Sequence, residues 1–142
     1  MKANRVFRWC QVAALIAMLA ASSCAKFPDD YDGYDTPVGL SPNNVILSAE
    51  GQSFQLTSEK YYYITRIVID GQHYTEFPRS TSNSKTSGAI DVEWVHWTHE
   101  EGDNFSTLLI DENASGKERT AIIQVSQGDA GDRLSIIQRP KE

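Results

Sequence analysis

Aromatic side chains in the middle of the chain are the residues whose type and spacing first suggest chemistry. They are Tyr61, Tyr62, Tyr63, Tyr74, Phe77, Trp94 and Trp97. Consecutive residues of a strand point to opposite faces, so three tyrosines in a row cannot all enter one core, and two tryptophans three apart also diverge if the strand is regular. We expect Trp97, Tyr62 and Tyr74 to be exposed as a platform for sugar rings or a protein. The alternative is that the whole set packs in the core and at its rim.

Histidines and carboxylates offer weaker signals for metal binding or catalysis. The spacing of His96 and His99 on a strand does not place both rings on one side, and zinc needs three or four converging ligands. Paired acids such as Asp91 and Glu93 could serve a glycosidase only across a cleft, for which a domain of this size has little room. The sequence contains no phosphate-binding or nucleophile motif. We therefore expect surface histidines, no metal, no cofactor and no catalysis; an enzyme is the least favoured alternative.

Residues 1–23 have the pattern of a secretory signal peptide. A basic start is followed by an apolar run over residues 12–21. A helix needs roughly 20 apolar residues to cross a bilayer, and this run is shorter. Residues 21–24 resemble a lipobox, the cut site of bacterial lipoprotein signal peptidase, with Ala21 where leucine is usual. The resemblance implies a lipid thioether on Cys24 after cleavage in front of it. The alternative is a plain signal peptide that happens to contain a cysteine.

Residues 24–43 are interpreted as the lipidated cysteine followed by an acidic flexible linker. Residues 25–37 hold four Asp, two Pro and one Gly without a period, so they bury too little surface to offset their ordering entropy. The stretch resembles acidic export signals that send Bacteroidota lipoproteins to the outer face of the outer membrane. We expect an outer-membrane lipoprotein exposed at the cell surface; a periplasm-facing position is the alternative. A calcium site is a further alternative, although the spacing of an EF-hand loop is absent.

Length and charge fit one globular domain that does not bind polyanions. The chain has 142 residues, of which 40% are hydrophobic and 23% charged, as in ordinary domains with a packed core. A chain that begins at Cys24 would carry ten basic against 19 acidic residues, a net charge of −9. Such a surface repels nucleic acid, which is therefore not an expected partner. Only one cysteine would remain, so no intramolecular disulfide could form.

The chain after position 43 carries the alternation of β-strands and no helical pattern. Strands are expected over residues 45–48, 53–57, 61–69, 73–77, 89–98 and 104–111. Asp70-Gly71 predicts a hairpin turn and residues 78–88 a loop. Residues 108–140 add a meander of three strands whose apolar faces are Leu108 and Ile110; Ala121, Ile123 and Val125; and Leu134, Ile136 and Gln138. Seven or eight strands over residues 44–142 predict an all-β, immunoglobulin-like β-sandwich.

The last block also resembles the BACON domain family. The residues that carry the resemblance are Asn113, Arg119-x-Ala121-x-Ile123-x-Val125 and Leu134-x-Ile136-x-Gln138. BACON domains are Bacteroidota β-sandwich modules proposed to bind carbohydrate or mucin, often placed at the front of larger secreted proteins. The resemblance implies this fold and a glycan or mucin as partner, although we expect the module to stand alone here, without the usual enzymatic partner. For Asn113 and Arg119 we expect structural roles at a turn.

Taken together, these patterns predict a non-catalytic, lipid-anchored envelope protein. The lipid on Cys24 would hold it to the membrane, because stable anchoring takes more than one acyl chain and each buried CH₂ contributes about 0.8 kcal/mol. The family resemblance favours carbohydrate or glycoprotein binding. The alternative is a structural or assembly lipoprotein that docks with other envelope proteins through a sheet edge or an apolar patch.

Overall fold

The computed structural model describes residues 36–142 as an all-β domain. Its strands are β1 (Thr36–Pro37), β2 (Asn44–Leu47), β3 (Gln52–Thr57), β4 (Tyr63–Ile69), β5 (Gln72–Tyr74), β6 (Gly88–Val92), β7 (Val95–His99), β8 (Phe105–Ile110), β9 (Arg119–Gln127) and β10 (Ala130–Gln138). The predicted signal peptide, Cys24 and most of the predicted linker lie outside these residues. Among the residues described, none forms a helix long and apolar enough to span a membrane.

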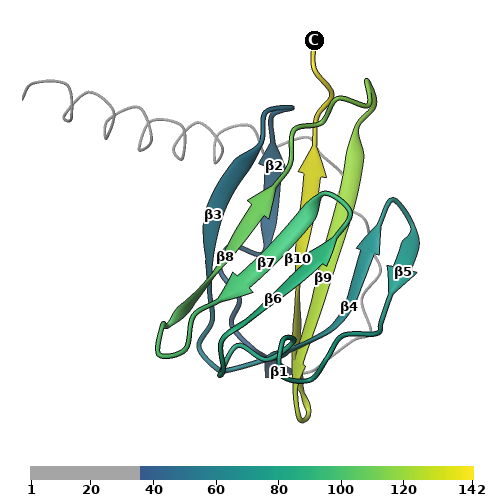
Figure 1. Cartoon of the computed structure of the whole chain (residues 1–142). Helices are drawn as coiled ribbons and strands as arrows, with labels where there is room; N and C mark the ends of the chain where they lie inside the picture. Colours follow the sequence, from purple (N-terminus) through teal and green to yellow (C-terminus); the bar gives the residue numbers. More distant parts are fainter. Residues whose placement is uncertain (1–35) are drawn as a thin grey trace, which may run out of the picture.

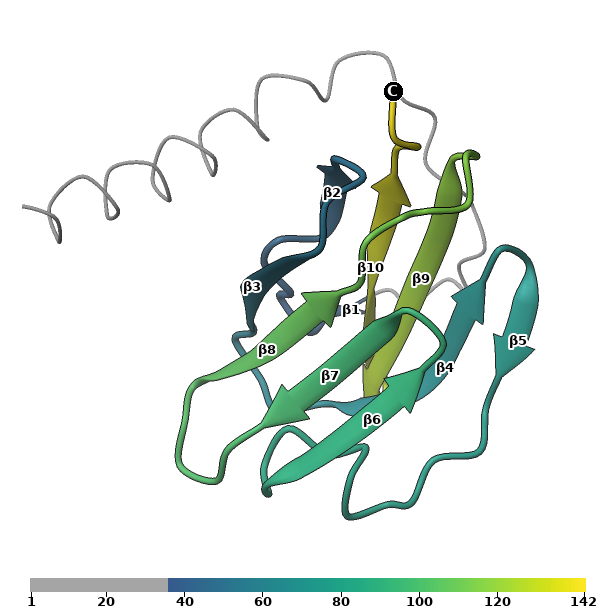
Figure 2. The ribbon, with the colours of Figure 1, turned by 45° about the horizontal axis from the view of Figure 1, so that its top comes forward.

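The strands form two sheets that face each other as an immunoglobulin-like β-sandwich (Figures 1 and 2). Sheet A has the order β1-β10-β9-β4-β5, with β2 also beside β10, and sheet B has the order β3-β8-β7-β6. β1 and β2 run parallel to β10, and the other strand pairs are antiparallel. The predicted fold class is confirmed, with ten strands in residues 36–142 instead of the seven or eight expected.

The apolar faces predicted over residues 108–138 form the centre of the core. Leu108, Ile123 and Leu134 are fully buried between the sheets. The predicted meander is wrong, because β8 pairs with β3 and β7 in sheet B while β9 and β10 form a hairpin in sheet A. Residues 111–118 therefore cross from one sheet to the other. Alternation shows that a strand has one buried face, but this pattern is the same in either sheet.

The single strand expected over residues 89–98 is a hairpin of β6 and β7. Val92 pairs with Val95, so Glu93 and Trp94 make the turn. Glu93 has a φ of 51°, a left-handed conformation that Gly or Asn usually supplies in such turns. The chain therefore carries no usual turn signal here. The turn also interrupts the alternation, so Trp94 and Trp97 are both buried and the predicted divergence of the two rings is wrong.

The sandwich begins before residue 44, where the linker was expected to end. β1 pairs with the start of β10, and the side chains of Val38 and Leu40 are buried in the core. The backbone N–H groups of Gly39 and Leu40 donate to the Asp132 carboxylate at 3.1 and 3.0 Å. Residues 36–43 are thus part of the folded body. Two apolar residues are too few to make a period, so composition alone assigned them to the linker.

Candidate functional site

Trp97 and Tyr62, predicted to be exposed, lie inside the sandwich with exposures of 0% and 1%. Trp97 Nε1–H donates to the Tyr62 hydroxyl oxygen at 3.1 Å, and that hydroxyl donates to Ser106 Oγ at 3.0 Å. Burial raises the pKa of Tyr62. Because the polar atoms of both rings have partners, the rings can leave water without an unpaired donor. Neither ring can serve as a binding platform in this fold.

His99 extends this interior assembly and is not the surface histidine that was expected. Its side chain is 4% exposed, and its ring stacks on Trp97 with centroids 6.2 Å apart and planes 14° apart. Nδ1 lies 3.0 Å from the Phe105 carbonyl oxygen and 3.2 Å from Ser106 Oγ. His99, which the sequence offered as a candidate metal ligand, therefore contributes to core packing.

Tyr61 and Tyr63 are the tyrosines that reach the surface, with exposures of 42% and 37%. Their rings meet edge to face with centroids 6.1 Å apart, and Lys85 Nζ lies 5.4 Å from the Tyr61 centroid. The alternation of side chains along a strand correctly predicted that the three consecutive tyrosines would point to different faces. It could not say whether Tyr62 or its two neighbours pointed inward, and the expected choice was wrong.

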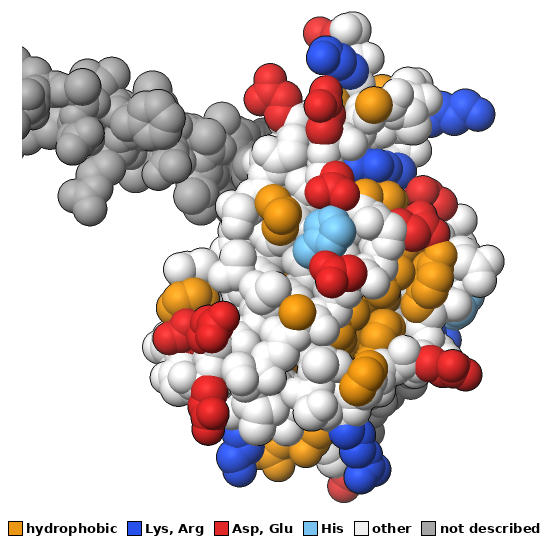
Figure 3. All heavy atoms as spheres, in the orientation of Figure 1, with side chains coloured by type: hydrophobic (Ala, Val, Ile, Leu, Met, Phe, Trp, Pro, Cys, Tyr) orange, Lys and Arg blue, Asp and Glu red, His pale blue; other side chains and the backbone are white. Residues whose placement is uncertain are grey.

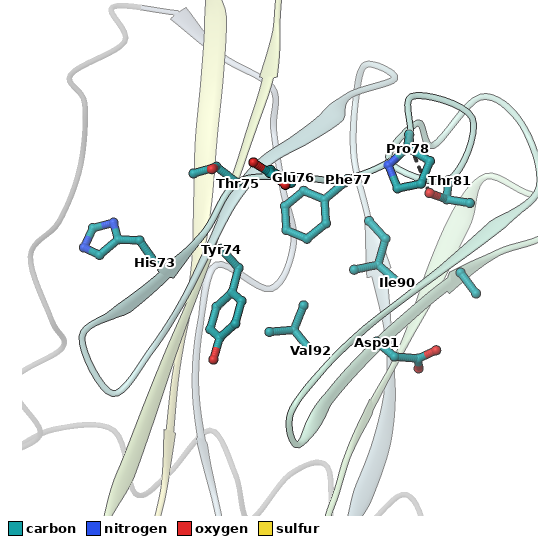
Figure 4. A pocket seen from close by; sticks show the side chains of 11 residues that line it. His73, Tyr74, Thr75, Glu76, Phe77, Pro78, Thr81, Ile90, Asp91 and Val92 are labelled. Carbon is teal, nitrogen blue, oxygen red and sulfur yellow. Dashed lines mark hydrogen bonds between the residues drawn. The ribbon is translucent and has the colours of Figure 1, made fainter.

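A groove of about 550 Å³ opens along the side of the sandwich where both sheets end, between β5 and β6 (Figure 4). β5 is shorter than the strand expected over residues 73–77, because the chain leaves sheet A after Tyr74. Tyr74 and Phe77 from this side face Ile90 and Val92 of β6 across the groove (Figure 4). Figure 3 shows hydrophobic side chains gathering beside a largely polar face. The groove thus has an apolar floor.

Polar groups stand around this floor. Thr75, Glu76, Thr81 and Asp91 belong to the lining. The half-buried Tyr74, predicted to be exposed, donates its hydroxyl hydrogen to the Glu93 carboxylate at the β6–β7 turn. This hydrogen bond raises the pKa of Tyr74. Tyr74 is the one predicted site residue that the structure places in a hollow. An aromatic floor with hydrogen-bonding groups at its rim is the usual composition of a ligand site.

The loop over residues 78–88 closes one end of the groove. A Cβ atom on Gly88 would lie 2.7 Å from the Cα atom of Thr81, so only glycine lets the loop backbone approach the start of β6. Within the loop, the backbone N–H of Thr81 donates to the Pro78 carbonyl at 2.9 Å, and Thr86 Oγ1 donates to the Ser80 carbonyl at 3.1 Å. The loop therefore holds the groove wall in place before any ligand arrives.

His96 lies on the outer face of sheet B between two carboxylates. Its Nδ1 is 2.7 Å from Asp91 Oδ1 and its Nε2 is 3.0 Å from Asp111 Oδ2. The hydrogen bonds with Asp111 and Asp91 raise the pKa of His96. Both ring nitrogens can donate only when the imidazole is protonated. When His96 is protonated, this clamp joins β6 and β7 to the residue that follows β8. In residues 36–142, no group of His, Cys, Asp and Glu is suited to hold a metal ion.

Asn113 and Arg119 close the end of the sandwich, as expected of structural residues. Asn113 is fully buried, and its Nδ2 donates to the carbonyl oxygens of Gln138 and Arg139 at 3.3 and 3.1 Å. Arg119 Nε donates to Gln138 Oε1 at 2.8 Å, and its guanidinium lies 4.2 Å from the centre of the Trp94 ring. The motif residues therefore tie the crossing segment to the end of β10.

Comparisons with known proteins support the fold. Residues 77–139 match the BACON family, which is described as "Putative binding domain, N-terminal". A protein from Bacteroides thetaiotaomicron solved by NMR is similar in fold, with a TM-score of 0.57 and 21% identity over 81% of this chain and 97% of that one. No curated protein matches the chain. The matched family segment starts at Phe77 on the groove and continues through β10.

Proposed function

Because this β-sandwich is a BACON-like domain, we propose that the protein is a non-catalytic binding module that holds a carbohydrate chain in the groove between β5 and β6. The observation that carries the proposal is the groove itself, where the aromatic side chains of Tyr74 and Phe77 lie beside Thr75, Glu76 and Asp91. A sugar ring has an apolar C–H face and a rim of hydroxyl groups. The groove offers a surface for each.

The site is also arranged before binding. The Tyr74 hydroxyl is already hydrogen-bonded to Glu93, and the loop that ends at Gly88 is packed against β6. Fixing side chains in advance reduces the entropy lost on binding, which costs about 0.5–1.5 kcal/mol for each immobilised side chain. A volume of about 550 Å³ lies within the range of small-molecule sites. These features favour a short glycan segment over a large flat partner.

A glycan array probed with the purified chain tests this proposal. Bound glycans should lose about tenfold or more in affinity on Phe77→Ala or Tyr74→Ala, because the loss of about 1.4 kcal/mol of stacking is tenfold in Kd. Tyr61→Ala is the matched control, since this exposed ring lies outside the groove. Circular dichroism checks that the variants fold. An array without binding, or equal losses for Tyr61→Ala and Phe77→Ala, would contradict the groove as the site.

The protein is further proposed to be held at the outer membrane, on the cell surface, by lipid on Cys24. The support is the lipobox-like sequence at residues 21–24 and the acidic stretch after it. Radiolabelled palmitate should enter the wild-type chain and not the Cys24→Ala variant, because the thioether needs the thiol. Equal labelling of the two chains would remove this part of the proposal.

An assembly role is the second candidate, and the exposed Tyr61–Tyr63 pair favours it. Two aromatic rings in contact at the surface resemble the anchors of protein interfaces, where tyrosine is enriched. Co-purification from membrane extracts separates the candidates. A partner that is lost on Tyr63→Ala and retained on Phe77→Ala would support assembly, whereas glycan binding with the reverse sensitivity would support the carbohydrate module.

A further inference from the structure

Negative charge surrounds the groove between β5 and β6. Glu76, in the segment after β5, and Asp91, on β6, belong to its lining, and Figure 4 shows them on its two sides. Glu93 adds a third carboxylate at the β6–β7 turn, where it accepts the hydrogen bond from Tyr74. Of the lining residues, all of which fall within residues 36–142, none is a lysine or an arginine. A ligand in the groove therefore meets carboxylates on both sides.

The basic side chains of this region do not offset these carboxylates inside the groove. The Arg119 guanidinium lies 4.2 Å from the centre of the Trp94 ring and donates to the Asp111 carbonyl oxygen at 2.7 Å. Arg79 is exposed in the loop that closes the groove and is not part of its lining. His73 lines the groove but is positive only when its imidazole is protonated. The lining therefore holds no permanent positive charge.

His96 compensates only part of the negative charge. Its ring lies between Asp91 and Asp111, at 2.7 and 3.0 Å from their carboxylate oxygens. A protonated imidazole carries one positive charge, so it offsets one of the two aspartates. The hydrogen bond that Glu93 accepts comes from a neutral phenol and leaves the charge of the carboxylate in place. Negative charge therefore remains at the rim whether or not His96 is protonated.

The hydrogen-bonding groups of the groove also favour ligands that donate. An ionised carboxylate accepts hydrogen bonds and cannot donate them. Two hydroxyl groups of the lining already give their hydrogens away, from Thr81 Oγ1 to the Pro78 carbonyl oxygen at 2.9 Å and from Tyr74 to Glu93. The hydroxyl and N–H groups of a sugar can donate to the carboxylates. A carboxylate or sulfate on the ligand would instead need donors, so charge and hydrogen bonding select the same ligands.

We infer that the groove selects glycans by charge, taking neutral or amino sugars and excluding sugars that carry a carboxylate or a sulfate. This inference rests on the proposed carbohydrate function and names the class of ligand for the same site. An anionic group would lie among like charges at a protein surface, where charges interact more strongly than in bulk water. In a branched glycan, the neutral segments would fit the groove, and ends that carry sialic acid or sulfate would not.

Matched glycans on an array, which share a core and differ in charge, test this selection. The pairs are N-acetyllactosamine with and without sulfate, and oligogalacturonate with and without methyl esters on its carboxylates. In every pair whose neutral member binds, the acidic member should bind at least about tenfold more weakly, because like charges at an interface suppress wrong partners. Added NaCl should reduce the difference, since the screening length falls from about 30 Å at 0.01 M to about 8 Å at 0.15 M.

Removal of single charges provides the matched comparison. Glu76→Gln keeps the size of the side chain and removes a charge from the lining. It should narrow the difference between acidic and neutral glycans several-fold. Glu101→Gln changes the net charge by the same amount at an exposed position between β7 and β8, outside the lining. This control should leave the ratio within about twofold, because exposed charges farther apart than the screening length are largely screened. Addition of Glu93→Gln, which leaves an oxygen to accept from Tyr74, should narrow the difference further.

The outcomes separate this inference from the proposed function. Acidic glycans that bind as tightly as their neutral partners would overturn the charge selection and leave a carbohydrate module in place. Equal changes for Glu76→Gln and Glu101→Gln would also overturn it, because the charge of the groove itself would then not decide. An array on which no glycan binds would contradict the proposed function, and the charge selection would fall with it.

Discussion

The interior of the sandwich and the groove on its open side are built from the same kinds of side chain, in two different relations to water. Inside, the Tyr62 hydroxyl joins Trp97 and Ser106 in a chain of hydrogen bonds. At the groove, the Tyr74 hydroxyl bonds to Glu93 in contact with solvent. Each phenol gives its hydrogen to an oxygen brought close by another part of the fold. The acceptors differ, since Tyr62 donates to a neutral hydroxyl and Tyr74 to a carboxylate.

The difference lies in what each bond does for the protein. A buried donor or acceptor that loses its partner has no water to replace it, so the interior bonds specify one packing arrangement. At an exposed position water can replace a lost partner, so the Tyr74–Glu93 bond orients the ring while contributing little to stability. The aromatic residues that look most suited to binding in the sequence therefore hold the fold, and a less conspicuous tyrosine remains available.

Removal of the interior indole should have the largest effect on stability. Trp97→Ala leaves a cavity where a fully buried ring stood and should lower the free energy of unfolding by about 3–5 kcal/mol. Urea titration followed by circular dichroism measures this loss. Tyr61→Ala, at an exposed position, is the control and should change stability by about 0.5 kcal/mol or less. Similar losses for both variants would break the contrast between interior and surface rings.

Deletion of a single oxygen from each of the two tyrosines compares the regions directly. Tyr62→Phe leaves Trp97 Nε1–H without its buried acceptor, whereas Ser106 Oγ keeps its contact with His99 Nδ1. The unpaired buried donor should cost about 1–3 kcal/mol. Tyr74→Phe removes a hydroxyl that water can replace, so its cost should stay within about 0.5 kcal/mol. Thermal unfolding of the pair under the same conditions gives the comparison. A larger loss for Tyr74→Phe would reverse our interpretation of the two sites.

The His96 clamp should give the smallest effect, with a definite pH dependence. The pKa of His96 is raised in the folded state. Its stabilising contribution is therefore complete below the ordinary histidine pKa of about 6.5 and is lost as pH rises through the raised value. His96→Gln should cost about 1 kcal/mol or less at acidic pH, because both aspartates are largely exposed. The cost should vanish at alkaline pH; a pH-independent difference would contradict the clamp.

Local alternation was enough to predict most of the core. Leu134, Ile136 and Gln138 were expected on one face of a strand, and all three have 0% exposure. Asp70-Gly71 was expected to turn a hairpin, and it does so with φ angles of 46° and 86°. These predictions succeeded because side-chain period and turn geometry depend on neighbours in the chain.

The candidate site could not be predicted in the same way. Tyr62 was expected outside because alternation alone does not say which face of the strand is buried. Trp97 was expected outside because the Glu93–Trp94 turn lacks the residues that usually mark a hairpin. The groove brings together Phe77, in the segment that follows β5, and Val92 on β6. These two residues meet only after both sheets have formed. The lining residues on β6 carried no distinctive signal of their own. Only Tyr74 among the predicted site residues lies in this hollow.

By itself, the order of residues determined that this chain forms strands, which side chains those strands turn away from water, and that Cys24 follows an apolar run over residues 12–21. Period, turn chemistry and composition are local properties, so they can be read along one dimension. The tertiary structure alone decided which sheet each strand joins, which of three consecutive tyrosines faces the interior, and that two strand edges leave a groove between them. Those outcomes depend on contacts between residues far apart in the chain, where several arrangements satisfy the same local pattern and packing selects one.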